Sequence, residues 1–299
     1  MAARILITGA TGTVGRPLVQ SLVQTRSRTH GDAIVAGIHT PAKQNQFDAL
    51  GIETVLLDYA DPKSIRAALA GVTRLFLVTG YSVDMLVHAK NVLDAAHAVH
   101  VEHVVHLGAA GSESQPYPHL AWHAYVESYI QTLGFSYTHL RPRTYMTNVL
   151  RGLRRGSTVI RQFFDNSAVT WIDPGDIAAV AAAALLNPSA HRNAAYTLAA
   201  EALPLSEVAS TLARATNIPF TYEPLDPARA LEALTKAGME PVYCKSLARH
   251  INDVALGVNS AVSDVNDTIE KVTGRPRARW NDFAQRHRDT IRRIVNGES

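Results

Sequence analysis

The sequence predicts an α/β protein in which a doubly wound parallel sheet is followed by a smaller C-terminal α/β lobe. Short apolar, β-branched runs alternate with segments of helical spacing through the first half of the chain. This order is typical of parallel strands joined by right-handed helical crossovers. The runs are continuously apolar, as in Leu75–Val78, which is expected when helices cover both faces of a sheet. A glycine-rich turn also follows the first run.

Six strands and five helices are expected in the first half, with bounds taken from the apolar periodicity. The strands are expected at Arg4–Thr8, Ala33–Ile38, Thr54–Leu57, Leu75–Thr79, His103–Leu107 and Ser136–Leu140. The helices are expected at Val14–Gln24, Pro41–Leu50, Pro62–Leu69, Val83–Ala98 and Leu120–Leu133. Asp61 before Pro62 is typical of a helix start, because an N-cap carboxylate precedes a proline at the first helical position.

The alternation changes after Arg141-Pro142. Short strands at Val169–Ile172, Ala195–Leu198 and Thr221–Pro224 mix with helices at Ile177–Leu186, Leu205–Thr216, Ala228–Ala237 and Cys244–Leu256. We therefore expect a first domain over residues 1–150 and a smaller substrate-binding lobe over 151–299. The strand and helix around 169–186 are expected to return to the first domain. No low-complexity linker separates the two parts.

Composition excludes several classes of protein. The chain has 299 residues, 46% of them hydrophobic and 18% charged, and a formal net charge of +3, which is too mild to indicate nucleic-acid binding. Cys244 is the sole cysteine, so no intramolecular disulfide and no cysteine-based metal site can form. The thirteen histidines show no metal-ligand spacing, and no metal is expected. The apolar N-terminal run is too short for a signal sequence, and Ile177–Leu186 is too short for a membrane span, so we expect a cytoplasmic protein.

The glycine-rich turn indicates a dinucleotide-binding Rossmann domain. Gly9, Gly12 and Gly15 lie between the first strand and the first helix, the context in which such a motif carries meaning. Gly9 would permit the sharp turn, Gly12 would let backbone approach a pyrophosphate, and Gly15 would let the helix pack closely on the strand. The free N–H groups of the helix would then face the phosphates. Thr11, Thr13 and Val14 complete this loop.

The second strand favours NADP(H) over NAD(H). It ends Gly37-Ile38-His39-Thr40 and lacks the acid that holds a ribose 2′-hydroxyl, whereas Lys43 follows within a turn and would attract a 2′-phosphate. The alternative is that His39 and Lys43 are ordinary surface residues. Further cofactor-binding candidates lie after the later strands, whose carboxyl ends share one edge of the sheet. They are Asp58, Tyr59, Thr79, Gly80, Gly108, Ala109 and Pro142.

Several segments together resemble the NmrA-like group of atypical short-chain dehydrogenases. They are Ile7–Gly15, Leu57–Pro62, Val104–Gly111, Leu133–Pro142, Trp171–Ala178 and Val272–Pro276, and they span nearly the whole chain. The resemblance implies a Rossmann domain with a small C-terminal lobe, substrate bound between them, and NADP(H) more often than NAD(H). Members of the group include NAD(P)H-dependent quinone reductases, reductases of specialised metabolism, and non-enzymatic regulators that sense the cofactor.

The Tyr-x-x-x-Lys pair of short-chain dehydrogenases is missing. The matching positions of the helix after the fifth strand hold His123 and Glu127, four residues apart on one helical face. The carboxylate could orient the imidazole and raise its pKa, which makes His123, Glu127 and Tyr145 the catalytic candidates. The alternative is that the pair only stabilises the helix. Tyr81, His119, Tyr145, Met146, Phe163 and Trp171 are candidates for contacting a flat substrate.

Two charged segments are interpreted as structural. Asp173 before Pro174 is expected to form a turn, and Asp176 to cap a helix beginning at Ile177. The basic stretch from Arg275 to Arg293 is expected to be a solvated helical face with apolar anchors.

The sequence therefore predicts an NADPH-dependent oxidoreductase that passes hydride to a quinone or a similar conjugated acceptor such as an enone or imine. Such acceptors take hydride without a strong proton donor, so the enzyme mainly has to hold them against the nicotinamide. The alternatives are a non-enzymatic NADP(H)-sensing regulator and a biosynthetic enzyme with non-redox chemistry. The expected partner is a small aromatic or conjugated molecule, without nucleic acid or membrane, and a homodimer is left open.

Overall fold

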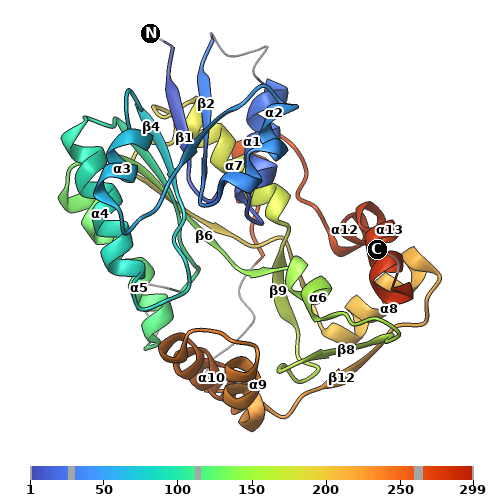
Figure 1. Cartoon of the computed structure of the whole chain (residues 1–299). Coiled ribbons are helices and arrows are strands. Elements are labelled where there is room, and N and C mark those ends of the chain that lie inside the picture. Colours follow the sequence, from blue (N-terminus) through green and yellow to red (C-terminus); the bar gives the residue numbers. More distant parts are fainter. Residues whose placement is uncertain (1, 26–30, 112–115, 259–264, 298–299) are drawn as a thin grey trace. The chain divides into compact units, whose positions relative to one another are not determined.

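A computed structural model of the chain describes residues 2–25, 31–111, 116–258 and 265–297 (Figure 1). The chain divides into two compact units. Unit 1 comprises Met1–Pro142 and Ile177–Thr197, and unit 2 comprises Arg143–Asp176 and Leu198–Ser299. The first crossing between the units thus follows Pro142, where β6 ends, and not residue 150.

Unit 1 is built on a seven-stranded sheet of strand order β10-β6-β5-β4-β1-β2-β3. Every pairing from β3 through to β6 is parallel, which confirms the predicted doubly wound α/β class. The strands are β1 (Arg4–Ile7), β2 (Ala33–Ile38), β3 (Glu53–Leu56), β4 (Arg74–Leu77), β5 (His103–Leu107), β6 (Ser136–Pro142) and β10 (Ala194–Leu198).

The helices of unit 1 follow the right-handed crossovers of a parallel sheet. They are α1 (Gly15–Thr25), α2 (Asn45–Asp48), α3 (Pro62–Ala68), α4 (Met85–Ala98), α5 (Pro118–Thr132) and most of α7 (Pro174–Leu186). Asp61 caps α3 as predicted, because its Oδ1 accepts a hydrogen bond from Lys63 N at 2.9 Å. The helix expected over Pro41–Leu50 is instead the 3₁₀ turn η2 (Pro41–Lys43) followed by the short α2.

Two sequence expectations about the sheet are wrong. The strand at Val169–Ile172 does not join the large sheet, because it pairs with Thr144–Tyr145 and with Glu201–Leu203 in unit 2. The strand near Ala195 does join it, beside β6. Helix α7 leads the chain back to unit 1, where β10 becomes the last strand of the large sheet. The apolar residues of α7 show that the helix is buried, but they do not indicate which sheet the next strand joins.

Unit 2 contains two small sheets and seven helices among its described residues. The first sheet has the order β11-β9-β7, with β7 (Thr144–Tyr145), β9 (Val169–Ile172) and β11 (Glu201–Leu203). The second pairs β8 (Val159–Gln162) with β12 (Thr221–Pro224) in parallel. The helices are α6 (Thr147–Gly152), α8 (Leu205–Thr216), α9 (Ala230–Lys236), α10 (Pro241–Ala255), α11 (Thr268–Thr273), α12 (Trp280–Arg286) and α13 (Arg288–Asn296), with the 3₁₀ turn η3 (Pro227–Arg229) before α9.

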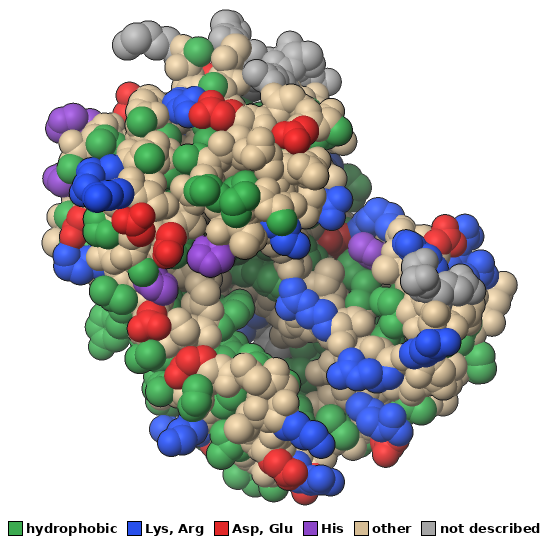
Figure 2. Space-filling model, in the orientation of Figure 1, with side chains coloured by type: hydrophobic (Ala, Val, Ile, Leu, Met, Phe, Trp, Pro, Cys, Tyr) green, Lys and Arg blue, Asp and Glu red, His purple; other side chains and the backbone are tan. Residues whose placement is uncertain are grey.

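The basic C-terminal helices of unit 2 are anchored by apolar side chains, as predicted. Trp280, Phe283 and Ile291 are buried in the core of this unit, while Figure 2 shows Lys and Arg side chains on the surface where Figure 1 places α8, α12 and α13. Trp171 and Trp280 meet edge to face with ring centroids 5.3 Å apart in that core. Among the described residues, no helix combines the length and the apolar character that a membrane span requires.

Asp176 has a different role from the predicted helix cap. α7 begins at Pro174, so Asp173 takes the capping position and its Oδ1 accepts from Gly175 N at 2.8 Å. Asp176 lies in the first turn and is buried. Its Oδ2 accepts from Ala278 N at 2.7 Å, and its Oδ1 pairs with Arg275 at 2.9 Å. Within unit 2, this carboxylate therefore fixes the segment that precedes α12.

We expect Asp176→Ala to lower the free energy of unfolding by about 2 kcal/mol, because the buried N–H of Ala278 would lose its acceptor. Chemical denaturation monitored by tryptophan fluorescence measures this, since Trp280 lies two residues further along. Asp289→Ala is the control, because the Asp289 side chain is exposed and forms a surface ion pair with its neighbour Arg288. Equal losses in the two variants would contradict the anchoring role of Asp176.

Candidate functional site

The glycine-rich loop forms the turn that the sequence predicts. Gly9 has φ +57°, a left-handed conformation that glycine adopts without strain. Gly12 N donates to Gly9 O at 2.9 Å, which closes the loop. A Cβ on Gly15 would collide with the carbonyl of Gly9, so this position requires glycine for α1 to start against the turn. Gly9 and Gly12 are exposed, and their backbone is accessible to a ligand.

The residues at the ends of β1 and β4 are tied together beneath this loop. Thr8 Oγ1 accepts from Val78 N at 2.9 Å, and Tyr59 OH donates to Val78 O at 2.8 Å. Burial raises the pKa of Tyr59 to about 12, so its phenol stays protonated. Tyr59 thus stabilises the sheet edge through its hydroxyl group, rather than presenting that group as a free donor to a ligand.

One buried polar atom at the same edge has no partner. Thr79 Oγ1 follows β4 and makes no hydrogen bond with any described residue, although it is inaccessible to solvent. A buried hydroxyl without a partner costs free energy, and such groups are found where a ligand or water completes them. Gly80 beside it leaves open space where a Cβ would point. Together with the exposed loop glycines, these features fit a dinucleotide laid along the carboxyl ends of the strands.

The adenosine end of the predicted site is exposed. His39 and Lys43, at the end of β2 and in η2, are both exposed, and so is Asp58 after β3. One oxygen of Asp58, Oδ1, accepts from Ala60 N at 2.9 Å and forms a local turn. These three residues follow neighbouring strands of the sheet, because β2 pairs with β3.

The predicted partners His123 and Glu127 lie on the same helix, but Glu127 binds a different residue. Both side chains are buried on α5, but Glu127 binds Arg141 of β6 through both oxygens, with Nε–Oε1 at 3.1 Å and Nη2–Oε2 at 2.6 Å. His123 Nδ1 has no partner among the described residues. Burial lowers the pKa of His123 to about 4. The hypothesis that Glu127 raises the pKa of His123 is therefore wrong, because the carboxylate is already neutralised by a guanidinium.

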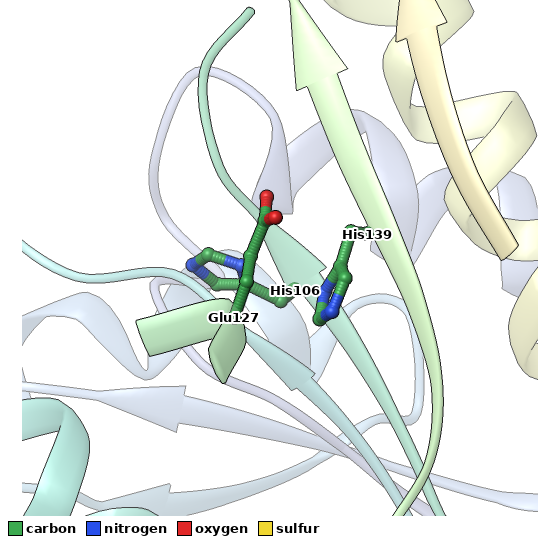
Figure 3. Close-up of side chains that lie close together, drawn as sticks. All are labelled: His106, Glu127 and His139. Atoms are coloured by element: carbon green, nitrogen blue, oxygen red, sulfur yellow. The ribbon is translucent and has the colours of Figure 1, made fainter. Parts of the chain in front are cut away.

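Sequence reasoning missed the polar cluster that surrounds this ion pair. His106 on β5 and His139 on β6 occupy paired positions of the sheet, and ligand-type atoms of His106, Glu127 and His139 all lie within 4.8 Å of one another (Figure 3). All three are buried. The available signal was the presence of histidines within apolar strands, at His103, His106 and His139. Their spacing in the sequence is not that of metal ligands.

This cluster has the residue types of a metal site but an unfavourable charge. Arg141 binds both oxygens of Glu127, so a divalent cation here would lie beside a buried guanidinium. The negative charge of Glu127 is already balanced by the positive charge of Arg141. A buried divalent cation would therefore find no further anion in the cluster to balance its charge. The residue types alone therefore do not make this cluster a metal site.

Gly108 connects the cluster to the carboxyl edge of the sheet. Its N donates to Leu140 O at 2.8 Å, and a Cβ would lie 3.2 Å from Glu127 Oε1. Next to it, Ala110 N donates to Pro142 O at 3.1 Å. The predicted cofactor residues Gly108, Ala109 and Pro142 thus lie together where β5 and β6 end.

Two of the predicted substrate-binding residues are core residues instead. Trp171 and Met146 are completely buried in the hydrophobic core of unit 2, and Trp171 Nε1 donates to Leu203 O at 3.0 Å. Phe163 and Tyr145 are half-buried in the same unit. In unit 1, Tyr81 is 57% exposed after β4, whereas His119 is buried at the start of α5, stacked on Tyr117. An aromatic side chain in a sequence does not reveal whether it faces a core or a ligand.

The histidine cluster predicts a loss of stability in mild acid. Burial, together with the charge of Arg141, lowers the pKa of His139 to about 3, whereas a histidine in the unfolded chain titrates near pH 6.5. Between these values the unfolded chain binds a proton that the folded chain does not. The contribution is therefore fully present above about pH 6.5 and is lost as the pH falls toward 3.

Lowering the pH from 7 to 5 should reduce the free energy of unfolding of both proteins. We expect this reduction to be about 2 kcal/mol smaller for the His139→Gln variant than for the wild type. Urea denaturation at both pH values measures the difference. His97→Gln is the matched control, because His97 is an exposed histidine of α4. If the two variants show the same pH dependence, His139 does not titrate as described.

Comparisons with known proteins agree with this architecture. Over 289 residues the chain is 32% identical to the NAD(P)H azoreductase of Xenophilus azovorans, covering 95% of this chain and 97% of the relative. It is 29% identical to quinone oxidoreductase 2 of Escherichia coli strain K12, covering 91% of this chain and 94% of that protein. The crystal structure of the Escherichia coli NADPH-dependent quinone oxidoreductase QOR2 complexed with NADPH superimposes with a TM-score of 0.78 at 27% identity, covering 94% and 99% of the two chains.

The family model agrees with these relatives. The NmrA-like family model matches residues 1–270, which include the glycine-rich loop, the histidine cluster and most of unit 2. The resemblance seen in the sequence is therefore confirmed, and the chain belongs to the NmrA-like family.

Proposed function

We propose that this protein is an NADPH-dependent reductase that transfers hydride to a conjugated acceptor, such as a quinone, an enone, an imine or an azo compound. The observation that carries the proposal is the combination of an intact dinucleotide loop with a catalytic helix that has no tyrosine–lysine pair. His123 and Glu127 take those positions, and Glu127 is bound to Arg141. Ordinary carbonyl reduction needs a proton donor activated by a neighbouring cation there, whereas a weaker donor suffices for conjugated acceptors.

The relatives support an NAD(P)H-dependent oxidoreductase. The names of two of them specify reduction of azo compounds and of quinones, both of which are conjugated acceptors of electrons. A solved relative carries NADPH. The acceptor of this chain is our inference from the chemistry of its own site.

NADPH, when bound, supplies the hydride, and the residues of this chain position it. The exposed backbone of Gly9 and Gly12 and the N-terminus of α1 would hold the pyrophosphate. Thr79 Oγ1, which has no hydrogen-bond partner among the described residues, would bond to the cofactor. Lys43 and His39, exposed after β2, would bind the 2′-phosphate.

Each unit by itself offers candidates for contacting the acceptor. His123 presents a neutral imidazole that can donate an N–H to a developing anion, and Tyr81 lies exposed after β4. In unit 2, Tyr145 and Phe163 remain as half-buried candidates for the acceptor site. A homodimer is left open.

Purified protein should oxidise NADPH, measured as loss of absorbance at 340 nm, with at least one acceptor from a panel of quinones, enones, imines and azo compounds. His123→Ala should slow that turnover by at least about tenfold while leaving NADPH binding unchanged, because general acid catalysis contributes rate rather than cofactor affinity. Tyr125→Ala is the control on the same helix, since Tyr125 is 65% exposed. Tight NADPH binding with no turnover of any acceptor would refute the proposal and favour a cofactor sensor.

Lys43→Glu should weaken NADPH binding by about tenfold and change NADH binding little, because only NADPH carries the 2′-phosphate. Calorimetric titration with each cofactor measures this. Lys236→Glu serves as the charge-matched control, since Lys236 is an exposed residue of α9 in unit 2. Equal weakening of both cofactors, or none, would remove Lys43 from the 2′-phosphate site.

A further inference from the structure

A line of polar side chains lies between α5 and the sheet of unit 1. His123, Glu127 and Gln131 recur every four residues along α5 and therefore lie on one face of the helix. Opposite them are His106 of β5 and His139 of β6, which pair with each other in the sheet register. We call these five residues the polar seam. The other buried side chains of α5 are apolar except for that of His119.

The seam runs along α5 from His123, in the N-terminal half of the helix, to Gln131 near its C-terminal end. The rings of His123 and His106 lie 5.8 Å apart between centroids, and those of His106 and His139 lie 5.7 Å apart. His139 Nε2 then lies 3.5 Å from Nε2 of Gln131, whose side chain is exposed. Because α5 is the helix that follows β5 in the chain, its N-terminal half belongs to the side of unit 1 where the carboxyl end of β5 lies.

Four ring nitrogens of the seam lack a hydrogen-bond partner among the described residues. Both nitrogens of His106 are buried without a hydrogen bond to any described residue, and so are Nδ1 of His123 and Nδ1 of His139. Such groups are rarely left empty, because each costs about 1–3 kcal/mol without a partner. A single water bridges polar atoms about 5 Å apart, and the ligand-type atoms of His106, Glu127 and His139 all lie within 4.8 Å of one another. Around His106, Glu127 and His139, this spacing matches that of side chains linked by internal water.

Glu127 and Arg141 keep the line electrically neutral. Because the carboxylate is bound by the guanidinium through both oxygens, it does not trap a proton on a neighbouring imidazole. Burial lowers the pKa of His106 well below its usual range, and it lowers the pKa of His123 to about 4. Neutral imidazole has one N–H donor and one acceptor nitrogen, so it can pass a proton along by accepting at one nitrogen and donating from the other.

We propose that the polar seam is a proton relay, in which His139, His106 and His123 carry protons from the exposed end at Gln131 to the acceptor at the carboxyl edge of the sheet. This inference rests on the reductase function proposed above. A two-electron reduction of an acceptor such as an azo compound takes up one hydride from NADPH and one proton. The hydride adds to one atom of the conjugated bond, and the electron pair of that bond becomes a lone pair on the other atom.

The relay supplies the proton to that atom. His123 donates its N–H to the new lone pair, and its other nitrogen accepts a proton from His106. His106 is replenished by His139, and His139 by water at Gln131. Each imidazole ends with its proton on the opposite nitrogen, and rotation of each ring restores the starting state. The net reaction consumes NADPH and one proton from solvent and requires no other reactant.

His106→Leu tests the relay, because it interrupts the line without touching the cofactor loop. With the acceptor that the wild type reduces best, turnover should fall about tenfold to a hundredfold while the Kd for NADPH, measured by fluorescence titration, stays unchanged. Imidazole buffer at increasing concentration should restore much of the rate, because a mobile acid replaces the lost path. A purely structural role for His106 would give no such recovery.

A second variant at the exposed end is independent of core packing. Gln131→Leu should slow turnover by about threefold, also with recovery in imidazole, whereas Gln20→Leu on the exposed face of α1 should have no effect. His103→Leu is the control for His106→Leu, because His103 is a buried histidine of the same strand that is hydrogen-bonded to Ser136 and Thr138 outside the seam.

The outcomes separate the two proposals. Slower turnover of His106→Leu and Gln131→Leu with recovery in imidazole supports the relay. An unchanged rate in both variants, or a loss that imidazole does not restore, overturns the relay and leaves the reductase function intact. A wild type that reduces no acceptor overturns the reductase function, and the relay with it.

Discussion

The ion pair between Glu127 and Arg141 determines the character of the candidate site. A carboxylate as deeply buried as Glu127 would be strongly destabilising without a partner, and Arg141 provides one through two parallel hydrogen bonds. The pair joins α5 to β6 and places a neutral salt bridge between the histidines of the seam. Burial lowers the pKa of each nearby imidazole, and a carboxylate that is already bound by a guanidinium does not oppose this, so the imidazoles remain unprotonated. Both the proposed lack of strong acid catalysis and the proposed relay follow from this one interaction.

The sequence predicted the parts of the fold that depend on local chemistry. The glycine spacing predicted a turn in which Gly9 needs a left-handed conformation and Gly15 leaves no space for a Cβ, and both conditions are met. Asp61 caps α3 because an N-cap carboxylate needs only the next two residues to act. The parallel order of β1 to β6 likewise follows from the alternation of elements along the chain.

The features that the sequence did not predict depend on residues that are distant along the chain. The partner of Glu127 lies fourteen residues away on a neighbouring strand, so helical spacing alone suggested His123 instead. Asp176 bonds to Ala278, over a hundred residues later, and no local pattern indicates that contact. Trp171 and Met146 have the side chains expected of a wall for a flat substrate, but their position in the core of unit 2 is fixed by elements that come much later, including α8 and α12.

The absence of the tyrosine–lysine pair and the presence of the seam can be related through the pKa of the proton donor. A tyrosine donates its proton efficiently only when a nearby cation lowers its pKa, and in this chain the nearest cation on β6, Arg141, is engaged by Glu127. A phenol at position 123 would therefore keep a pKa too high for rapid donation and release. A neutral imidazole avoids this requirement, because it donates one proton only as it accepts another, and its charge does not change. Such a donor depends on a continuous supply of protons behind it, and the proposed relay would provide that supply through the adjacent rings of His106 and His139.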